Sequence, residues 1–468
     1  MIRLHVHLLA LTAWMPVVAF AVPPAAESDP VLASLVREAL EHNPECARSR
    51  AELAAERERI PQAGALADPT LTLGIQNDGF KSIQIGTAET SFWLVMITQP
   101  LPWPGKRGLR EDVARSAAST AEATVNRLEF TIRAEVERGY VDLLLVRGQL
   151  ELLGRLEALW REAEAIARAR YEVGAVTQSD LVRAQLERTR LVQQRLALEA
   201  SERSRLQALN RLRVHPLDEP IETPRRISDM AEPKLPSVDE AMADAETRSP
   251  DLALARGTVR TAERRVDLAR RERYPDFTVS AAIMPRGGLE PMWSANVGIS
   301  IPIWAGRKQS RAVAESVSLQ DAEAQGEESI RQVLRLRTQE RLTALEALLK
   351  TLRLYREGLL VQSDTAVRST VGQYKVGKVP FASVLEVMRG LVADEGGYLD
   401  TIAQAQRMAI AQRELSLQPT PGIGGGATAM GGGSVPGSSG ITSGSARPSG
   451  GAAASAAPAQ AGSSGSGM

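Results

Sequence analysis

The sequence predicts a mostly α-helical protein with a small transmembrane β part, built from two similar halves. Three observations predict this fold: two long Pro-free stretches whose apolar residues step by three and four, short segments in which polar and apolar residues alternate, and landmarks that recur in the same order. The 468 residues are 43% hydrophobic but only 4% aromatic, so the apolar content is mostly Leu, Ala and Val, which suits long helices.

Charge and residue usage exclude several classes of function. The 56 Lys and Arg residues balance 56 Asp and Glu residues, and this zero net charge argues against a nucleic-acid partner. A single cysteine, Cys46, excludes a disulfide framework within the chain, and with four His a Cys/His zinc site is not expected. No phosphate-binding loop or nucleophile motif is present. We therefore predict no enzyme activity, no cofactor and no metal ligands.

The two ends of the chain are expected to lie outside the folded part. Residues 1–21 contain an apolar run followed by Ala19-Phe20-Ala21, which is typical of a cleaved signal peptide; an uncleaved anchor is the alternative. Residues 418–468 are almost entirely Gly, Ser, Ala, Pro and Thr. Such a segment cannot bury enough apolar surface to offset its ordering entropy, so we predict a disordered tail.

Between the ends, the chain repeats itself. Pro44 matches Pro250 and Pro69 matches Pro275, and both pairs are 206 positions apart. The later landmarks are Trp103-Pro104-Gly105-Lys106, which matches Trp304-Ala305-Gly306-Arg307, and Tyr171-Glu172-Val173-Gly174, which matches Tyr374-Lys375-Val376-Gly377. We predict a first structural repeat at 22–212 (β-hairpin at about 70–99, long helical hairpin at about 106–212), a linker at 213–237, and a second repeat at 238–417 (β-hairpin at about 277–301, long helical hairpin at about 308–415).

Each half is predicted to run helix, two strands, very long helix, turn, helix. Three of the strand segments alternate between polar and apolar residues, as in Leu71, Leu73 and Ile75 with their polar neighbours, whereas Ser91–Gln99 is apolar on both faces. The long helices, each on the order of 100 Å at 1.5 Å per residue, each meet a Val-Gly turn. The predicted long helices span about Lys106 to Arg170 and Lys308 to Gln373, and the return helices span Ser179–Leu212 and Ala382–Leu415.

The strands indicate a membrane barrel that one chain cannot close. Strands of nine to eleven alternating residues are typical of transmembrane barrels, and two hairpins are too few, because the smallest barrels have about eight strands. Other copies must therefore cover the open edges; a small soluble sheet is the alternative. Four Trp residues cluster here and are candidate membrane-interface aromatics: Trp93, Trp103, Trp293 and Trp304.

The repeated Pro-strand-strand-Pro blocks and the two Tyr-x-Val-Gly turns resemble the TolC-type outer-membrane efflux factors over roughly residues 30–417. The resemblance implies a homotrimer whose twelve-stranded outer-membrane β-barrel continues into a periplasmic α-helical tunnel, with the linker at its waist. It implies a passive duct in the outer membrane of a Gram-negative bacterium, in contact with outer-membrane lipid. The implied partners are a periplasmic adaptor protein and an inner-membrane pump, often of the resistance-nodulation-division type.

The segment from Gln99 to Lys106 looks like that of members which serve heavy-metal pumps, and so implies heavy-metal cations as substrates. Drug or protein export through the same fold stays open, because the pump and not the duct selects the substrate. A periplasmic coiled-coil adaptor or scaffold protein is the alternative from another class, although adaptors carry one helical hairpin per chain and this sequence predicts two.

The resemblance places functional sites at the two turns. The tips at which adaptors dock in this family match Val173, Gly174, Ala175, Val176, Thr177, Val376, Gly377, Lys378 and Val379. An entrance gate matches Asp180 and Tyr374, and Glu386 falls where a carboxylate can face the pore. The pattern departs at Val379 and Ser383, which stand where the family can place an Arg and an acid, so one salt bridge of that gate is missing. A solvated helix face is the plainer interpretation of Glu386, and a helix C-cap that of Val-Gly.

Overall fold

The computed structural model describes residues 29–174 and 176–419. The predicted signal peptide, Ala175 and all but the first two residues of the predicted tail lie outside the described residues. The first half contains α1 (Pro30–His42), α2 (Pro44–Gly64), β1 (Thr70–Gln76), β2 (Phe92–Leu101), α3 (Lys106–Glu172) and α4 (Gln178–Arg213). The second half contains α5 (Val238–Arg248), α6 (Pro250–Arg271), β3 (Phe277–Arg286), β4 (Leu289–Ile299), α7 (Gln309–Leu354), α8 (Leu360–Lys375) and α9 (Phe381–Glu414).

The matched prolines begin matched helices. Pro44 and Pro250 are the first residues of α2 and α6, where the missing N–H costs nothing and the fixed φ suits a helix. The preceding residues cap these helices: Asn43 Oδ1 accepts a hydrogen bond from the Glu45 amide at 2.8 Å, and Ser249 Oγ accepts one from Leu252 at 3.3 Å. The same two residues, Asn43 and Ser249, also end the short helices α1 and α5. These short helices were not predicted as separate elements.

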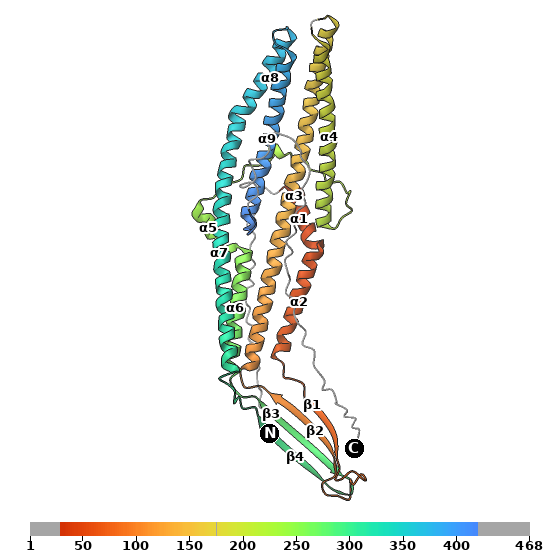
Figure 1. The fold of residues 1–468 in the computed structure, drawn as a ribbon, viewed down its shortest axis with the longest axis vertical. Helices are drawn as coiled ribbons and strands as arrows, with labels where there is room; N and C mark the ends of the chain where they lie inside the picture. Colours follow the sequence, from red (N-terminus) through yellow and green to blue (C-terminus); the bar gives the residue numbers. More distant parts are fainter. Residues whose placement is uncertain (1–28, 175, 420–468) are drawn as a thin grey trace, which may run out of the picture. The chain divides into compact units, whose positions relative to one another are not determined.

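The long helices organise the packing in each half. Helix α3 is one unbroken helix of 67 residues, and both α2 and α4 pack on it, one after the other along its length (Figure 1). In the second half, α6 and α9 pack in the same way along α7 and its continuation. Fully buried Leu143, Leu144 and Leu156 of α3 belong to the main hydrophobic core, together with Phe381 and Val384 of α9.

The second long helix contains a local irregularity. The sequence predicts a long helix from about Lys308 to Gln373, and the structure is helical over this range, with a π-helical turn at Tyr355–Leu359 between α7 and α8. Here the Tyr355 ring lies 6.1 Å from that of Tyr398 on α9, and a Cβ on Gly397 would come within 2.5 Å of the Tyr355 hydroxyl. The turn contains Gly358, but a single glycine inside a helical pattern does not by itself predict a π-helical turn.

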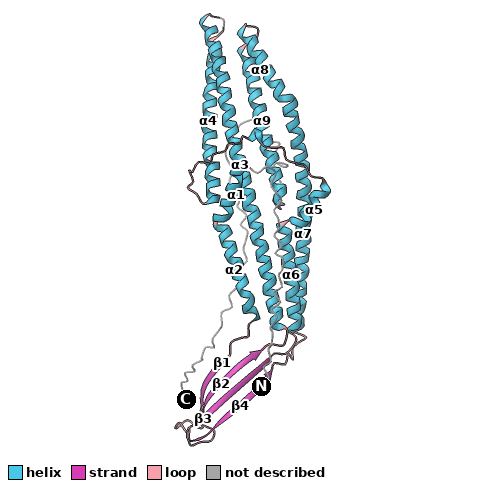
Figure 2. Cartoon of the chain, turned by 180° about the vertical axis from the view of Figure 1, so that it is seen from behind, coloured by secondary structure: helices cyan, strands magenta, loops and turns pink. Residues whose placement is uncertain are grey.

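The strands form one antiparallel sheet in the order β1-β2-β3-β4, at the ends of the helices (Figure 2). The central pair, β2 with β3, joins the two halves and sets Leu101 opposite Phe277 and Val95 opposite Ile283. Strands β1 and β4 are the edges.

Among the described helices, none is long and apolar enough to cross a membrane.

Candidate functional site

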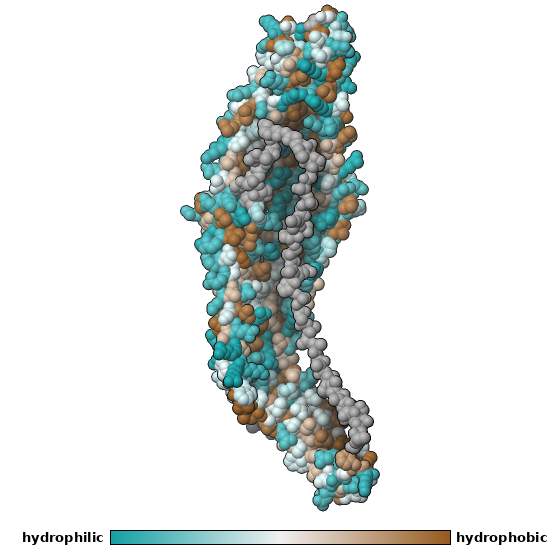
Figure 3. All heavy atoms as spheres, viewed as in Figure 1, coloured by the Kyte–Doolittle hydropathy of each residue, from teal (hydrophilic) through white to brown (hydrophobic). Residues whose placement is uncertain are grey.

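One face of the sheet is apolar and open to solvent. Because side chains alternate along a strand, the registers bring most of the large apolar residues of the four strands to the same face. The opposite face carries Thr, Ser, Asn and Gly residues together with Phe92, Leu94, Met96, Met284 and Met292. Brown, hydrophobic surface is visible over part of the sheet in Figure 3. The large exposed side chains of this face are Leu71, Leu73, Ile75, Trp93, Val95, Ile97, Val279, Ile283, Trp293, Val297 and Ile299.

The four predicted interface aromatics lie at two levels of the sheet. Trp93 and Trp293 lie in β2 and β4 toward the hairpin loops, and both are exposed on the apolar face. Trp304 follows β4 at the helical end of the sheet and is 68% exposed. Trp103 also lies at the helical end, but its ring is half-buried and stacks on Tyr274 and Phe277, with centroids 5.3 and 5.5 Å apart.

A buried lysine fastens the two halves together where strand gives way to helix. Lys106, at the start of α3, is 3% exposed, and its Nζ donates to the Tyr274 carbonyl at 2.7 Å and to Asp276 Oδ1 at 2.8 Å. Asp276 Oδ1 also accepts from the Trp103 amide at 2.8 Å. Burial opposes ionisation of this carboxyl, but the bonds from Lys106 and Trp103 outweigh it and hold the pKa of Asp276 below its ordinary value.

We name this contact the junction latch: Trp103, Lys106, Tyr274, Asp276 and Phe277. Nearby, the Arg271 guanidinium covers the Tyr274 ring at 4.8 Å and donates to the Pro104 carbonyl at 2.7 Å. The Lys106–Asp276 pair was not predicted from the sequence. The only available signal was the matched Gly-Lys and Gly-Arg after each Trp, which marks a repeated position but not its partner.

The two hairpin tips have the same backbone conformation. Val173 and Val376 end their helices at φ −93°, ψ 8° and φ −94°, ψ 8°, and Gly174 and Gly377 follow with φ of 73° and 77°. At the second tip the Gly377 amide donates to the Tyr374 carbonyl and the Lys378 amide to the Gln373 carbonyl, which is a Schellman cap. Glycine is required here because side chains rarely adopt this positive φ.

The tips expose apolar side chains. Val173 is 78% exposed and Val376 is 69% exposed. Val176 and Val379 are only partly exposed, and Val379 packs against the core. The surface that a partner would meet is therefore formed by Val173 and Val376 more than by the second valine of each turn.

The structure brings Tyr374 under Arg170 and near Asp180. Arg170 lies over the Tyr374 ring at 4.9 Å and donates to the Tyr374 carbonyl at 2.8 Å, so α3 is fastened to the end of α8. Tyr374 is 1% exposed, and its hydroxyl has no hydrogen-bond partner among the described residues. Burial raises the pKa of Tyr374; the Arg170 charge opposes this effect and the Asp180 charge adds to it.

Glu386 lies on the opposite side of α9 from its packed face. The buried residues Phe381, Val384 and Met388 face the core, whereas Glu386, two positions from Val384, is exposed. No ion pair to Glu386 occurs among the described residues. Its carboxylate therefore has no charge partner within the described part of one chain.

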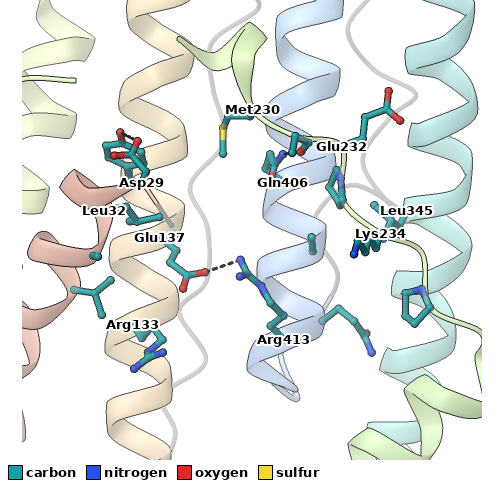
Figure 4. A pocket seen from close by; sticks show the side chains of 18 of the residues that line it. Asp29, Leu32, Arg133, Glu137, Met230, Glu232, Lys234, Leu345, Gln406 and Arg413 are labelled. Atoms are coloured by element: carbon teal, nitrogen blue, oxygen red, sulfur yellow. Dashed lines mark hydrogen bonds and ion pairs between the residues drawn. The ribbon is translucent and has the colours of Figure 1, made fainter. Parts of the chain in front are cut away.

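A cavity of about 1050 Å³ lies near the middle of the helices, between α1, α3, α9 and the linker (Figure 4). It contains both signs of charge, and Arg413 Nη2 donates to Glu137 Oε2 at 2.8 Å across it. No group of three or more His, Cys, Asp or Glu side chains suited to a metal ion occurs among residues 29–174 and 176–419.

Comparison with known proteins identifies the class. The family model described as outer membrane efflux protein matches residues 35–214 and 241–416, one segment in each half. The chain therefore belongs to the outer membrane efflux protein family. It is an outer-membrane efflux channel protein that extends into the periplasm, which favours the duct over the adaptor or scaffold alternative.

The individual relatives reported below share a quarter or less of their aligned residues with this chain. The chain is 25% identical over 355 residues to the cobalt-zinc-cadmium resistance protein CzcC of Cupriavidus metallidurans, covering 75% of this chain and 81% of that protein. It is 24% identical over 386 residues to nodulation protein T of Rhizobium leguminosarum bv. trifolii, covering 78% and 80%. A solved structure of CusC, described as forming a transmembrane channel, matches with a TM-score of 0.70 at 16% identity, covering 83% and 92%. These three proteins are named as a resistance protein, a nodulation protein and a transmembrane channel, and none is named as an enzyme.

Proposed function

We propose that this protein is a passive, non-enzymatic duct of a tripartite efflux system and that three copies form it. The observation that carries the proposal is the sheet: it exposes one apolar face, and within residues 29–174 and 176–419 its two edge strands are unpaired on one side. In a membrane every backbone polar group must be paired, so the edges of several copies must meet in a closed barrel. Three sheets of four strands give the twelve-stranded barrel, and the helical hairpins give the periplasmic tunnel. In this duct, residues 22–212 and 238–417 are its two repeats and 213–237 its linker.

We propose heavy-metal cations as the substrate. The support is the similarity to a cobalt-zinc-cadmium resistance protein over three quarters of the chain, together with the segment from Gln99 to Lys106. The test is deletion of the gene in its host, followed by growth in graded cobalt, zinc and cadmium. We expect lower tolerance to at least one metal, restored by the gene in trans. Unchanged metal tolerance with increased sensitivity to organic drugs would instead support drug export.

The proposed partners meet the duct at its tips. Val173 and Val376 are exposed apolar side chains on turns of the same conformation, and such side chains are stabilised when a partner covers them. A periplasmic adaptor is the proposed partner at this surface, and it connects the duct to an inner-membrane pump of the resistance-nodulation-division type.

Glu386 is proposed to face the entrance of the tunnel beside the Asp180–Tyr374 gate. In a trimer the three carboxylates would form a ring without a countercharge from their own chains, and such a ring attracts cations. We expect Glu386→Gln to lower the cation-over-anion selectivity of purified channels in planar bilayers, with little change in trimer stability because the side chain is exposed. Glu357→Gln, on the π-turn, is a matched control. Equal selectivity in the Glu386 variant and the parent would assign Glu386 to a solvated helix face.

A further inference from the structure

The short sequence at which strand gives way to helix occurs twice. Among the described residues, only in the first copy do the Trp and the cation contact partner side chains. Trp103, Gly105 and Lys106, at the start of α3, have the same spacing as Trp304, Gly306 and Arg307, which precede α7. In the first copy, the Trp ring is stacked and the cation is buried. In the second copy, Trp304 is 68% exposed and Arg307 is exposed. Among the described residues, neither of these two side chains has a stacking or ion-pair partner.

The place of each copy in the sheet explains this difference. The first copy follows β2, which pairs with β3, so its Trp and Lys reach the residues that precede and begin β3. The second copy follows β4, which is an edge strand. In the repeat, β4 corresponds to β2 and β1 corresponds to β3, so the strand that would pair with β4 as β3 pairs with β2 is a β1 strand. The β1 strand of the same chain lies at the opposite edge of the sheet. The second copy can therefore find an equivalent contact only on another chain.

The duplication identifies the surface that this contact would use. With Pro69 matched to Pro275, Leu71 takes the place of Phe277, and Thr70 takes that of Asp276. Asp68 takes the place of Tyr274. Leu71 is 62% exposed, and Asp68 and Thr70 are exposed as well. The surface around the start of β1 is therefore uncovered in the described part of one chain.

The second copy and the surface at the start of β1 both differ in sequence from the junction latch, and the differences on the two sides compensate each other. The carboxylate at Asp276 is absent at the matched position, Thr70, but one is present at Asp68, two residues away and so on the same side of an extended chain. The cation differs as well: Arg307 stands in the second copy where Lys106 stands in the first. The Arg side chain is longer and its five N–H donors suit a carboxylate. No ion pair to Asp68 occurs among the described residues. An aromatic residue, Trp304, would pack on an aliphatic one, Leu71, where Trp103 packs on Phe277.

We infer that Trp304 and Arg307 of one copy bind Leu71 and Asp68 of the next copy, and that this intermolecular contact repeats the junction latch between chains. The inference rests on the proposed trimer and adds to it the residues that hold neighbouring chains together at the helical end of the barrel. With one latch inside each chain and one between chains, every junction between hairpins around the ring is fastened in the same way.

Disulfide cross-linking tests this contact directly. In a Cys46→Ala background, Trp304→Cys is combined with Leu71→Cys, and outer membranes are oxidised and examined by non-reducing denaturing electrophoresis. We expect covalent dimers and trimers that dithiothreitol dissociates. The two residues lie at opposite edges of one sheet, so a link within a chain cannot produce this result. The Trp103→Cys, Phe277→Cys pair is the control, and it should link within a chain and stay monomeric.

The possible outcomes distinguish a failure of the inferred contact from a failure of the proposed trimer. If the unheated Trp304–Leu71 variant runs as a trimer but gives no covalent dimers or trimers, the latch between chains is wrong and the proposed trimer stands. If the Cys46→Ala parent is monomeric, both proposals fail.

A charge series supplies independent evidence. We expect Arg307→Asp to lower the temperature at which the trimer dissociates by several degrees, Arg307→Lys to preserve it because the first copy uses Lys, and Asp68→Arg with Arg307→Asp to restore it. Arg311→Asp is the matched control. The counterpart of Arg311 in the first half, Arg110, pairs with Glu272, but Leu66 occupies the position equivalent to Glu272 and offers no carboxylate. Arg307→Asp without any effect would contradict the inferred contact.

Discussion

Replacing Val173 and Val376 together with Asp is expected to abolish export while leaving the trimer intact. Both side chains are exposed, so the change removes little packing within the chain. A docked partner would have to bury two unpaired carboxylates per chain, and each costs more than the roughly 1–3 kcal/mol of an unsatisfied neutral polar group. We expect metal tolerance to fall to that of the deletion strain, and co-purification of the adaptor with the duct to be lost.

The control for this experiment is Leu217→Asp, an exposed apolar residue in the linker away from the tips. It should support full tolerance at equal amounts in the outer membrane. Export at the parental level by the Val173, Val376 double variant would show that the tips do not form the docking surface.

Replacing Lys106 with Met is expected to reduce the amount of assembled protein in the outer membrane severalfold. The side chain is 3% exposed and donates two hydrogen bonds across the two halves, and a hydrogen bond to a charged group contributes roughly 1.5–3 kcal/mol. Asp276 regains water when Lys106 is lost, because its side chain is 43% exposed, so the net loss lies at the lower end of that range. The measurement is the heat-resistant trimer in membrane fractions and the melting temperature of the purified protein.

The effect of Lys106→Met should also depend on pH. The folded-state pKa of Asp276 is held below its ordinary value, so the ionised carboxylate stabilises the fold above the unfolded pKa of about 3.9. That stabilisation is lost as the pH falls through the lower folded pKa. The difference in melting temperature between parent and variant should therefore be largest near neutral pH and shrink below about pH 4.

Lys350→Met is a suitable control for this series, because Lys350 forms a surface ion pair with Glu346 that contributes little. An equal melting temperature for the parent and the Lys106 variant at neutral pH would show that the junction latch does not stabilise the protein.

The sequence predicted the elements whose signals are long or repeated. The 67 residues of α3 contain no Pro and have apolar residues that step by three and four, so the helix was found nearly to its ends. The strands were recognised by alternation, and the tips by Val-Gly at the same place in both halves. These signals are local, because they depend on the conformation of neighbouring residues rather than on distant contacts.

The features that the sequence did not predict depend on contacts between distant residues. Lys106 and Asp276 are 170 positions apart, and each one alone resembles an ordinary surface charge. At the π-turn of Tyr355–Leu359, the Tyr355 ring lies against Tyr398 and its hydroxyl approaches Gly397 of another helix. Trp103 was predicted to lie in a membrane-interface belt, and its stacking on Tyr274 and Phe277 could not be read from alternation alone.

The measurement that tests the central claim most directly is fractionation of the membranes that contain the protein, followed by size analysis of the detergent extract with and without heating. We predict that the protein is in the outer-membrane fraction and has the size of a trimer before heating and of a single chain afterwards. A soluble periplasmic monomer would contradict the proposed duct, because a single sheet with an apolar face and two open edges cannot form a closed barrel.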